Sequence, residues 1–365
     1  MTMFLTIAVV VLIFIVIFQI SKASEYVSVI NGNDTARKQS NKINGFLMLG
    51  FMIFGLIGVW YCNELLYHKT LMAQPAASNH GEKVDEMLKL TVVITGIVFI
   101  ITQVLLFWFS YKYQEKEGRK VFHFAHSSKL EAVWTAIPAI VLAILVIIGL
   151  KNWYAITGDA PKNALEVEVV GKQFGWIFRY KGNDNQFGKK YFKIIDNATN
   201  PLGLIWEDNE KLNLKKDTAG FDDVVVEQTL YLIKDRPVRL IIGSRDVIHD
   251  VGLSHFRMKM DAVPGTPTTM WFTPKYTTAE MKEITKNPNF VYEISCDQMC
   301  GNGHYSMKGT VEVVTQAQYD AWMAKQQSAY SKLSPKEEVK PAIADTTKPA
   351  IAAVSVANKP IAKNN

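Results

Sequence analysis

Four long apolar runs in the first 150 residues constrain this chain more than any other feature of its sequence. Each run is free of charged residues and is close to the roughly 20 residues that an α-helix needs to cross the hydrocarbon layer of a membrane. A helix buried in a soluble core seldom runs this far without a charge, so we expect four membrane-spanning helices. The runs cover about 4–20, 46–62, 90–109 and 133–150.

Basic residues in the connecting segments predict how these helices are oriented. Segments 21–45 and 110–132 carry four and five Lys or Arg residues, whereas segment 63–87 carries two. Since basic loops stay on the cytoplasmic side, everything after Leu150 should lie in the periplasm of a bacterium whose inner membrane holds the chain. A cleaved signal peptide is the alternative for the first run, but the preceding "MTMF" has no basic side chain, which favours a retained helix.

Residues 162–315 change to short runs of strand character, such as "ALEVEVVG", "GWIFRY" and "MKGTVEVV". Their alternation of apolar and polar residues predicts an antiparallel sandwich or barrel, and no strand–helix–strand rhythm appears. A polar, loop-rich segment at about 182–223 is expected to be an exposed insertion between two strands. Residues 316–333 predict a terminal helix that rests on the barrel.

The last residues, 334–365, repeat "KPAIA" and are rich in Lys, Pro and Ala. This composition is typical of a disordered extension or tether. The net charge of +6 is explained largely by this tail and by the membrane-flanking loops. The charge therefore gives no reason to expect nucleic acid as a partner.

The stretch "CDQMCGNGHYSM" contains two of the three cysteines, Cys296 and Cys300, followed by His304 and Met307. A disulfide is the main alternative in an exported domain, but it leaves the histidine and the methionine unexplained. Thiolate, thioether and imidazole together suit copper, whereas zinc would use the cysteines and the histidine and leave Met307 idle. A mononuclear blue-copper centre uses one cysteine, so the second thiolate indicates a second copper bridged to the first.

A symmetric copper pair needs one more nitrogen ligand. His249 is the best candidate, because it follows a β-rich run and precedes a turn, so that a sandwich could bring it beside the later loop. His255, which follows closely in the sequence, competes with it.

Three stretches, "DVIH", "MKMDAVPG" and "CDQMCGNGHYSM", together resemble subunit II of the haem-copper cytochrome c oxidases. Members of that family carry a dinuclear copper centre, called CuA, in an exported cupredoxin domain. The resemblance covers about residues 85–325 and implies N-terminal transmembrane α-helices followed by an exported all-β, cupredoxin-like Greek-key sandwich. It implies copper ligation by the side chains of His249, Cys296, Cys300, His304 and Met307 and by the backbone carbonyl of Gln298.

The same resemblance divides the membrane part into two hairpins. Residues 85–152 correspond to the usual helix pair of the family, and residues 1–65 form an extra pair, which could pack against neighbouring subunits or another respiratory complex. Glu131, in "LEAVWTAIPAI", matches the position at the cytoplasmic mouth of a proton path into the catalytic subunit. Oxidase subunits I and III are the expected partners.

Two departures from the family pattern concern cofactors. Family members commonly have a glutamate between the cysteines, where its side chain helps to hold a magnesium ion. Gln298 is uncharged and a poorer ligand, which weakens the case for magnesium. No CxxCH motif occurs in the chain, so we expect no covalent haem.

The residues expected to meet the electron donor differ as well. The electron-accepting tryptophan of the family lies in a stretch like "GHQWYW", which here reads "GKQFGW", so that Phe174 takes its place and Trp176 remains nearby. Arg245, beside Asp246, stands where an acidic residue often attracts a basic cytochrome c. These changes predict a donor other than a freely diffusing basic cytochrome c, such as a membrane-held cytochrome c domain.

The sequence therefore predicts the electron-accepting subunit of a respiratory oxidase, which passes electrons from a cytochrome c donor to haem in subunit I. Oxygen is reduced to water there, and protons are translocated. Two alternatives remain open. The first is a membrane-anchored copper-delivery protein of the thioredoxin-like type, which would need a βαβ core and have no use for Met307. The second is a copper-less structural subunit of a quinol oxidase, which would have lost the copper ligands.

Overall fold

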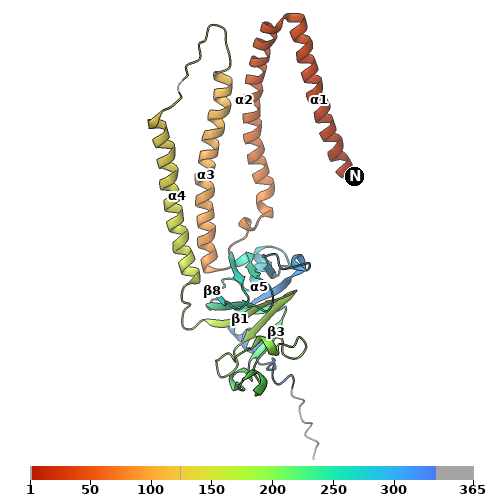
Figure 1. The fold of residues 1–365 in the computed structure, drawn as a ribbon, viewed down its shortest axis with the longest axis vertical. Helices are drawn as coiled ribbons and strands as arrows, with labels where there is room; N and C mark the ends of the chain where they lie inside the picture. Colours follow the sequence, from red (N-terminus) through yellow and green to blue (C-terminus); the bar gives the residue numbers. More distant parts are fainter. Residues whose placement is uncertain (1, 124, 334–365) are drawn as a thin grey trace, which may run out of the picture.

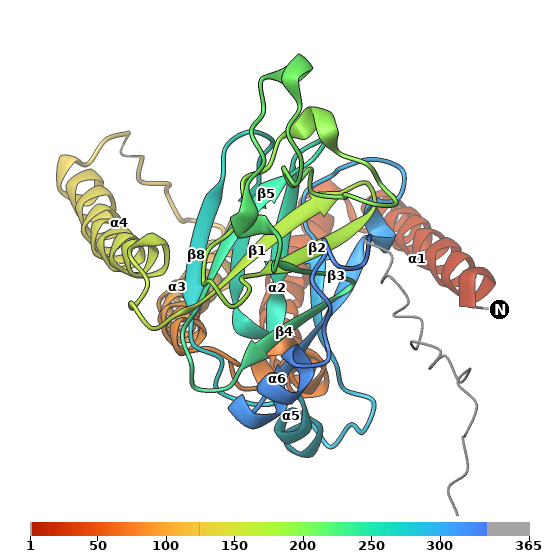
Figure 2. The same cartoon turned by 90° about the horizontal axis from the view of Figure 1, so that it is seen from below.

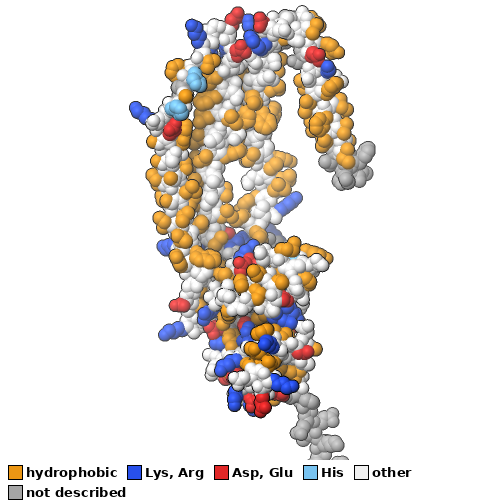
Figure 3. Space-filling model, in the orientation of Figure 1, with side chains coloured by type: hydrophobic (Ala, Val, Ile, Leu, Met, Phe, Trp, Pro, Cys, Tyr) orange, Lys and Arg blue, Asp and Glu red, His pale blue; other side chains and the backbone are white. Residues whose placement is uncertain are grey.

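Four long helices form the N-terminal part of the chain (Figure 1). The computed structural model describes residues 2–123 and 125–333, so the predicted disordered tail at 334–365 lies outside the described residues. The helices are α1 Thr2–Asn31, α2 Asn33–Leu66, α3 Asn79–Lys112 and α4 Ser128–Thr157. All four are long and apolar enough to cross a membrane, and apolar side chains cover the visible faces of the bundle (Figure 3). They confirm the expected N-terminal membrane helices.

Local signals set the helix ends and the direction of the chain. Gly32, with a φ of 79°, separates α1 from α2, and only glycine adopts this conformation without cost. Ser78 caps α3, since its Oγ accepts a hydrogen bond from the backbone N–H of Gly81 at 2.9 Å. The turn between α1 and α2 and the loop between α3 and α4 lie at one end of the bundle, and the C-terminal domain lies at the other (Figure 1). This arrangement agrees with the orientation predicted from the basic loops.

The C-terminal domain is a sandwich of two five-stranded sheets, seen from below the bundle in Figure 2. One sheet has the order β3-β2-β1-β5-β8, and the other has the order β4-β10-β9-β6-β7. The strands are β1 Leu165–Lys172, β2 Gly175–Tyr180, β3 Val224–Glu227, β4 Thr229–Ile233, β5 Val238–Ser244, β6 His249–Leu253, β7 Met258–Ala262, β8 Thr268–Phe272, β9 Tyr292–Cys296 and β10 Lys308–Val314. This architecture confirms the expected all-β sandwich.

Two strand pairings differ from the purely antiparallel arrangement that the sequence pattern predicts. β1 pairs with β5 in parallel, and β4 pairs with β10 in parallel. In each pair the strands are far apart in the sequence, and the long connection that a parallel pair requires is supplied by the intervening strands. The sandwich is therefore mainly antiparallel, as expected, with two parallel pairs that the sequence pattern did not indicate.

A single apolar stretch, "VVVEQTLYLI", supplies one strand to each sheet. Gln228, with a φ of 69°, separates β3 from β4. Its N–H donates to the carbonyl of Trp176 in one sheet at 3.3 Å, and its carbonyl accepts from the N–H of Thr310 in the other sheet at 2.8 Å. The bend at this residue thus lets the chain cross from one sheet to the other.

The insertion, residues 182–223, is more ordered than its composition predicts. It contains the 3-10 helices Phe192–Ile194, Glu210–Leu212 and Thr218–Gly220. An apolar cluster, separate from the main core between the two sheets, joins it to the outer face of the β1–β2 pair. This cluster is formed by Val170, Ile177, Leu202, Leu204, Trp206, Val225 and Ala329. Because both faces of β2 are covered, all of its residues are buried. The insertion is exposed over much of its length, as expected, but residues 202–206 are buried against the sandwich.

Two short helices complete the domain, α5 Thr278–Ile284 and α6 Gln316–Met323. α6 begins with a capping box between Thr315 and Gln318, and it ends ten residues short of the predicted helix 316–333. Trp322 of α6 stacks on Tyr231 of β4, with ring centroids 4.2 Å apart. The terminal helix thus packs on the sandwich even though it is shorter than predicted.

Candidate metal centre

Two neighbouring strands, β6 and β9, bring a distant histidine to the cysteine motif. β6 begins at His249 and β9 ends at Cys296, and the two strands pair antiparallel with Val251 opposite Cys296. Because alternate residues of a strand face the same side of the sheet, His249 shares its face with Val251 and Cys296. The pairing therefore places His249 beside a cysteine that lies 47 residues away in the sequence.

The metal loop, residues 296–307, joins β9 to β10 and is held by its own turns. The N–H of His304 donates to the carbonyl of Gly301 at 3.0 Å, and the N–H of Met307 donates to the carbonyl of His304 at 3.1 Å. The N–H of Cys296 donates to the carbonyl of Met307 at 3.1 Å, which closes the two ends of the loop. Gly301 has a φ of 137°, where a side chain would be strained.

The side chains that the resemblance implies as copper ligands all lie close together. Sγ of Cys296 lies 3.7 Å from Nδ1 of His249, 3.7 Å from Sγ of Cys300 and 3.1 Å from the carbonyl oxygen of Gln298. Sγ of Cys300 lies 3.8 Å from Nδ1 of His304 and 3.8 Å from Sδ of Met307. Both cysteines are free thiols rather than a disulfide. The arrangement leaves both sulfur atoms available to a metal.

The chemistry of this donor set fits copper. His249, Cys296, Cys300 and Met307 are buried, and no carboxylate stands among the converging atoms. Burial, together with the contact with Cys296, raises the pKa of the Cys300 thiol to about 11. Ligation requires thiolates, so metal binding there would release protons. Two thiols, a thioether and two imidazoles select a soft or borderline metal over magnesium or calcium.

A carboxylate that the sequence reasoning did not assign to the site orients His249. Oδ1 of Asp246 lies 2.7 Å from Nε2 of His249, which leaves Nδ1 facing Cys296. Partial burial raises the pKa of Asp246, but hydrogen bonds from the Gln173 backbone, the His249 ring and the Val247 backbone together hold that pKa below its usual value. A carboxylate in this position fixes the imidazole ring and makes it a better ligand. The spacing Asp-x-x-His could have indicated this contact between Asp246 and His249 from the sequence.

Two aromatic side chains lie beside the site, one at the surface and one in the interior. Phe174 is 42% exposed, and a Cβ added at Gly303 would lie 2.5 Å from its ring, so Phe174 covers the metal loop. Trp176 is fully buried and meets the His249 ring edge-on, with centroids 6.1 Å apart. A Cβ at Gly171 would lie 2.7 Å from Cδ2 of His249, which explains the glycine there. Of these two rings, Phe174 is therefore the one that can touch a protein docked on the metal loop.

Three other residues singled out from the sequence lie away from the converging donors. His255 belongs to the 3-10 helix Ser254–Phe256, and its ring packs on Phe290 and Tyr292. Arg245 turns toward the insertion, where it donates to Oδ1 of Asn197 at 2.5 Å. Glu131 lies half exposed in the first turn of α4, at the end of the bundle opposite the sandwich (Figure 1).

Comparison with known proteins places the chain in one family. The family model for "Cytochrome C oxidase subunit II, transmembrane domain" matches residues 67–151, and the model for the "periplasmic domain" of the same subunit matches residues 165–314. The "Alternative cytochrome c oxidase subunit 2" of Bradyrhizobium diazoefficiens is 30% identical over 294 residues, which cover 80% of this chain and 93% of that protein. The chain belongs to the cytochrome c oxidase subunit II family. Residues before 67 lie outside both matched ranges.

Other members of the subunit II family resemble the chain less closely. The "Cytochrome c oxidase subunit 2" of Cereibacter sphaeroides is 24% identical over 262 residues, covering 72% of this chain and 82% of that protein. The crystal structure of the periplasmic domain of subunit II from Bradyrhizobium japonicum covers 48% of this chain and all of that chain, with 22% identity and a TM-score of 0.30.

Membership of the subunit II family confirms the resemblance seen in the sequence. The chain is a subunit of a haem-copper oxidase, which is an oxidoreductase complex. It is a membrane protein whose cupredoxin-like C-terminal domain is exported. The two-sheet sandwich also removes the basis for a thioredoxin-like copper-delivery protein.

Proposed function

We propose that this subunit accepts electrons from a cytochrome c donor at a dinuclear copper centre, CuA, and passes them to haem in subunit I, where oxygen is reduced to water and protons are translocated. The observation that carries this proposal is the convergence of two free thiols, two imidazoles, one thioether and one carbonyl oxygen around the Cys296–Cys300 pair. The copper-less alternative would have no use for such a donor set.

Each donor has a distinct role in this proposal. Copper would be held by the thiolates of Cys296 and Cys300, by the imidazoles of His249 and His304, and more weakly by Met307 and the Gln298 carbonyl. Bound there, two copper ions supply a one-electron acceptor whose charge is shared between them. The paired strands, the closed loop and Asp246 hold the donors in place, so the ligands need to move little when the charge changes.

The proposed setting is the inner membrane of a bacterium, with the sandwich in the periplasm and oxidase subunits I and III as neighbours. Residues 85–152 form the usual helix pair, residues 162–315 the cupredoxin domain and residues 316–333 the terminal segment. The extra pair, residues 1–65, would meet neighbouring subunits or another respiratory complex. Magnesium is left out of the proposal because Gln298 offers no carboxylate.

The test of the copper centre uses the full chain, purified in detergent and loaded with copper. We expect about two copper ions per chain and an electron paramagnetic resonance spectrum from one electron shared by two copper nuclei. Cys300→Ser should abolish the shared spectrum and leave at most a single-copper signal, because one bridging sulfur is lost.

Cys62→Ser is the matched control, since Cys62 is an exposed cysteine of α2 and is not one of the converging donors. This variant should keep both the copper content and the shared spectrum of the unaltered chain. An unchanged spectrum in Cys300→Ser, or a single-copper spectrum in the unaltered chain, would remove the assignment.

Glu131 is proposed as the carboxylate at the cytoplasmic mouth of a proton path into subunit I. Two features support this role: its place in the first turn of α4, on the side of the membrane away from the sandwich, and its half-exposed side chain. In the assembled oxidase, Glu131→Ala should slow turnover at a proton-uptake step and leave the copper spectrum unchanged. Turnover equal to that of the unaltered oxidase would show that the residue is an ordinary interfacial carboxylate.

The proposed donor is a membrane-held cytochrome c domain that docks on the metal loop. The rim of the loop is apolar and exposed, formed by Phe174, Val247, Ile248, Met299 and Tyr305. The carboxylate of Asp246 is engaged with His249 and the Gln173 backbone. An apolar rim attracts a partner by contact rather than by charge, so reduction of the subunit should depend weakly on salt. Fast reduction by a soluble basic cytochrome c, with steep salt dependence in stopped flow, would exclude this donor.

A further inference from the structure

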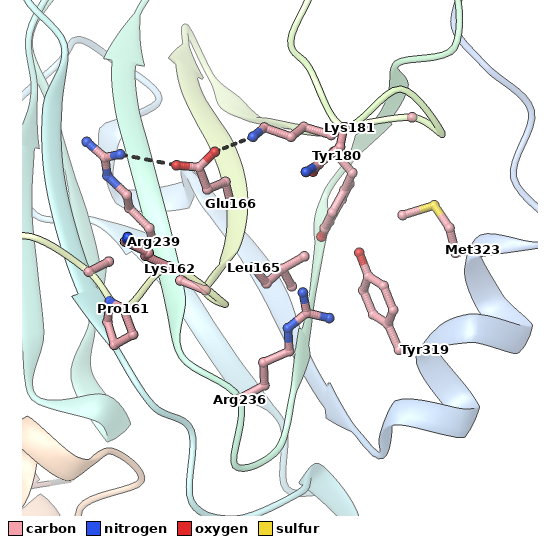
Figure 4. A pocket seen from close by; sticks show the side chains of 14 residues that line it. Pro161, Lys162, Leu165, Glu166, Tyr180, Lys181, Arg236, Arg239, Tyr319 and Met323 are labelled. Atoms are coloured by element: carbon pink, nitrogen blue, oxygen red, sulfur yellow. Dashed lines mark hydrogen bonds and ion pairs between the residues drawn. The ribbon is translucent and has the colours of Figure 1, made fainter.

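A cavity of about 430 Å³ opens where four segments of the exported domain meet, at the end of the β1–β2 pair opposite the end that contacts His249. We call it the basic pocket. The linker 160–164 after α4, the paired strands β1 and β2, the start of β5 and helix α6 all contribute to its wall (Figure 4). Its volume lies within the range of small-ligand sites in proteins, about 300–1,000 Å³. None of its lining residues takes part in the metal centre.

Four cationic side chains and one carboxylate line the basic pocket, namely Lys162, Lys181, Arg236, Arg239 and Glu166. Glu166 is already shared, because it pairs with Lys181 and accepts a hydrogen bond from Nη1 of Arg239 at 3.1 Å. The hydrogen bond from Lys181 lowers the pKa of Glu166 against the opposing effect of burial, so this carboxylate is ionised at neutral pH. The lining therefore keeps an excess of three positive charges.

The two cations not engaged by Glu166 have hydrogen-bonding capacity to spare. Arg236 uses Nε to donate to the carbonyl of Asn163 at 3.3 Å, and within the described chain its two terminal nitrogens have no partner. Lys162 is exposed and likewise has no hydrogen-bond or ion-pair partner among the described residues. Donors that are left free in a concave site are available to an anion.

Two buried tyrosines set the floor of the basic pocket. The hydroxyl of Tyr180 is fully used, since it accepts from the N–H of Tyr231 at 2.7 Å and donates to its carbonyl at 3.2 Å. Tyr319 of α6 is also buried, and its hydroxyl points into the space beside Arg236 (Figure 4). Within the described residues this hydroxyl makes no hydrogen bond, so it offers one more donor to a ligand.

We propose that the basic pocket binds a phosphate-bearing anion, held by Lys162, Arg236 and Arg239 with the hydroxyl of Tyr319 at its base. Guanidinium groups present paired N–H donors that match the oxygens of phosphate, and charge-assisted hydrogen bonds of this kind are about twice as strong as neutral ones. A monocarboxylate would balance one of the three excess charges, whereas a phosphate group carries closer to two. The site is independent of the copper proposal.

The position of the linker allows two sources for that phosphate group. α4 ends at Thr157, and Lys162 follows five residues later, so an extended chain keeps Lys162 within roughly 18 Å of the helix end. An anionic lipid headgroup near the end of α4 is therefore one source to test, and a free phosphorylated solute of the exported compartment is the other. Both present the same chemistry, and the experiment must separate them.

The first arm of the test titrates inorganic pyrophosphate into the detergent-solubilised full chain by calorimetry. The second arm places the chain in nanodiscs of phosphatidylcholine with and without phosphatidylglycerol, and native mass spectrometry counts the lipids retained. Lys162→Gln and Arg236→Gln should each weaken binding about tenfold, because each removes one charge-assisted contact. The double variant should show no specific binding.

Lys215→Gln is the matched control, since Lys215 is an exposed lysine of the insertion that lies outside the basic pocket. It removes the same charge and should leave binding unchanged, while tryptophan fluorescence reports that every variant is folded. Pyrophosphate binding that is lost in the pocket variants identifies a free anion as the ligand. Selective retention of phosphatidylglycerol, lost in the same variants, identifies a lipid headgroup. If neither probe distinguishes the double variant from the unaltered chain, the proposal is wrong.

Discussion

The metal loop and the insertion are both long, strand-poor segments of one sandwich, yet they depend on opposite kinds of contact. The metal loop, residues 296–307, is closed by hydrogen bonds among its own residues, and His249 is the distant residue that completes its set of donors. The insertion, residues 182–223, is fixed by side chains of the strands beneath it. The loop therefore carries its chemistry in a short sequence, whereas the insertion depends on long-range packing.

A buried ion cluster fastens both ends of the insertion to β1 and β2. Arg179 donates to Glu168 at 2.6 Å, to Asp223 at 3.0 Å and to the carbonyl of Gly188 at 2.7 Å. Asp223 in turn accepts from the N–H of Gly188 at 3.0 Å. Gly188 lies near the start of the insertion and Asp223 at its end. One arginine therefore connects the two ends through β2, and we call Arg179, Glu168 and Asp223 the Arg179 cluster.

The largest effect that we predict comes from Arg179→Met. This change leaves the buried carboxylates of Glu168 and Asp223 without their central cation, and breaking a buried ion pair in this way typically costs about 3–5 kcal/mol. Urea unfolding of the full chain in detergent, followed by tryptophan fluorescence, measures the loss. Copper content should stay at its unaltered value under native conditions, because no donor touches the cluster. A matching loss of copper in the folded variant would show that the two regions are coupled.

The pH dependence of the same variant sharpens this prediction. Burial raises the pKa of Asp223 to about 6, and Arg179 is the main influence that lowers it. Without Arg179 that pKa should rise further. A carboxyl group whose pKa is raised in the folded state favours folding below its unfolded pKa and loses this contribution as pH rises through the folded pKa. The deficit of Arg179→Met should therefore shrink as pH falls from about 8 to about 5. A deficit independent of pH would mean that lost packing, not the uncompensated charge, is responsible.

The same contrast explains how far the sequence alone leads. The apolar runs, the strand alternation and the ligand spacing are local signals, so the membrane helices, the sandwich and the metal loop could all be predicted. The choice of His249 over His255 depends on the register of β6 against β9, which no local pattern contains. The parallel pairings and the bend at Gln228 are likewise long-range outcomes.

The insertion shows where composition misleads. Its polar residues predict exposure, but a few apolar residues, Leu202, Leu204 and Trp206 among them, cover the outer face of β1 and β2. The strand "GWIFRY" could have indicated that this face is covered, because apolar residues lie on both of its faces and its arginine is buried with them. A strand that is apolar on both sides requires a cover on both sides. In this domain the insertion supplies the second cover.

In the metal loop, a smaller effect is expected from Asp246→Asn, and it should appear in copper affinity and not in stability. Asp246→Asn keeps the shape of the side chain but removes the charge that holds Nε2 of His249. Losing such a carboxylate typically lowers metal affinity by about 10–100-fold. Competition with a copper chelator measures the affinity. Asp196→Asn, which alters a carboxylate on a local turn of the insertion, is the matched control and should leave copper affinity unchanged.

The smallest predicted effect concerns Met307, the most weakly bound of the proposed side-chain ligands. Leu has nearly the same volume as Met, so Met307→Leu in this buried position should cost less than about 1.5 kcal/mol of stability. The bridging thiolates and both imidazoles remain, so two copper ions and a shared electron paramagnetic resonance spectrum should be retained. The thioether donates electron density that favours the oxidised centre, and its removal should raise the reduction potential. Spectroelectrochemical titration measures that shift. An unchanged potential would mean that Met307, whose Sδ lies 3.8 Å from Sγ of Cys300, only packs against the site. The methionine of the motif would then serve packing, as the apolar residues of the insertion do.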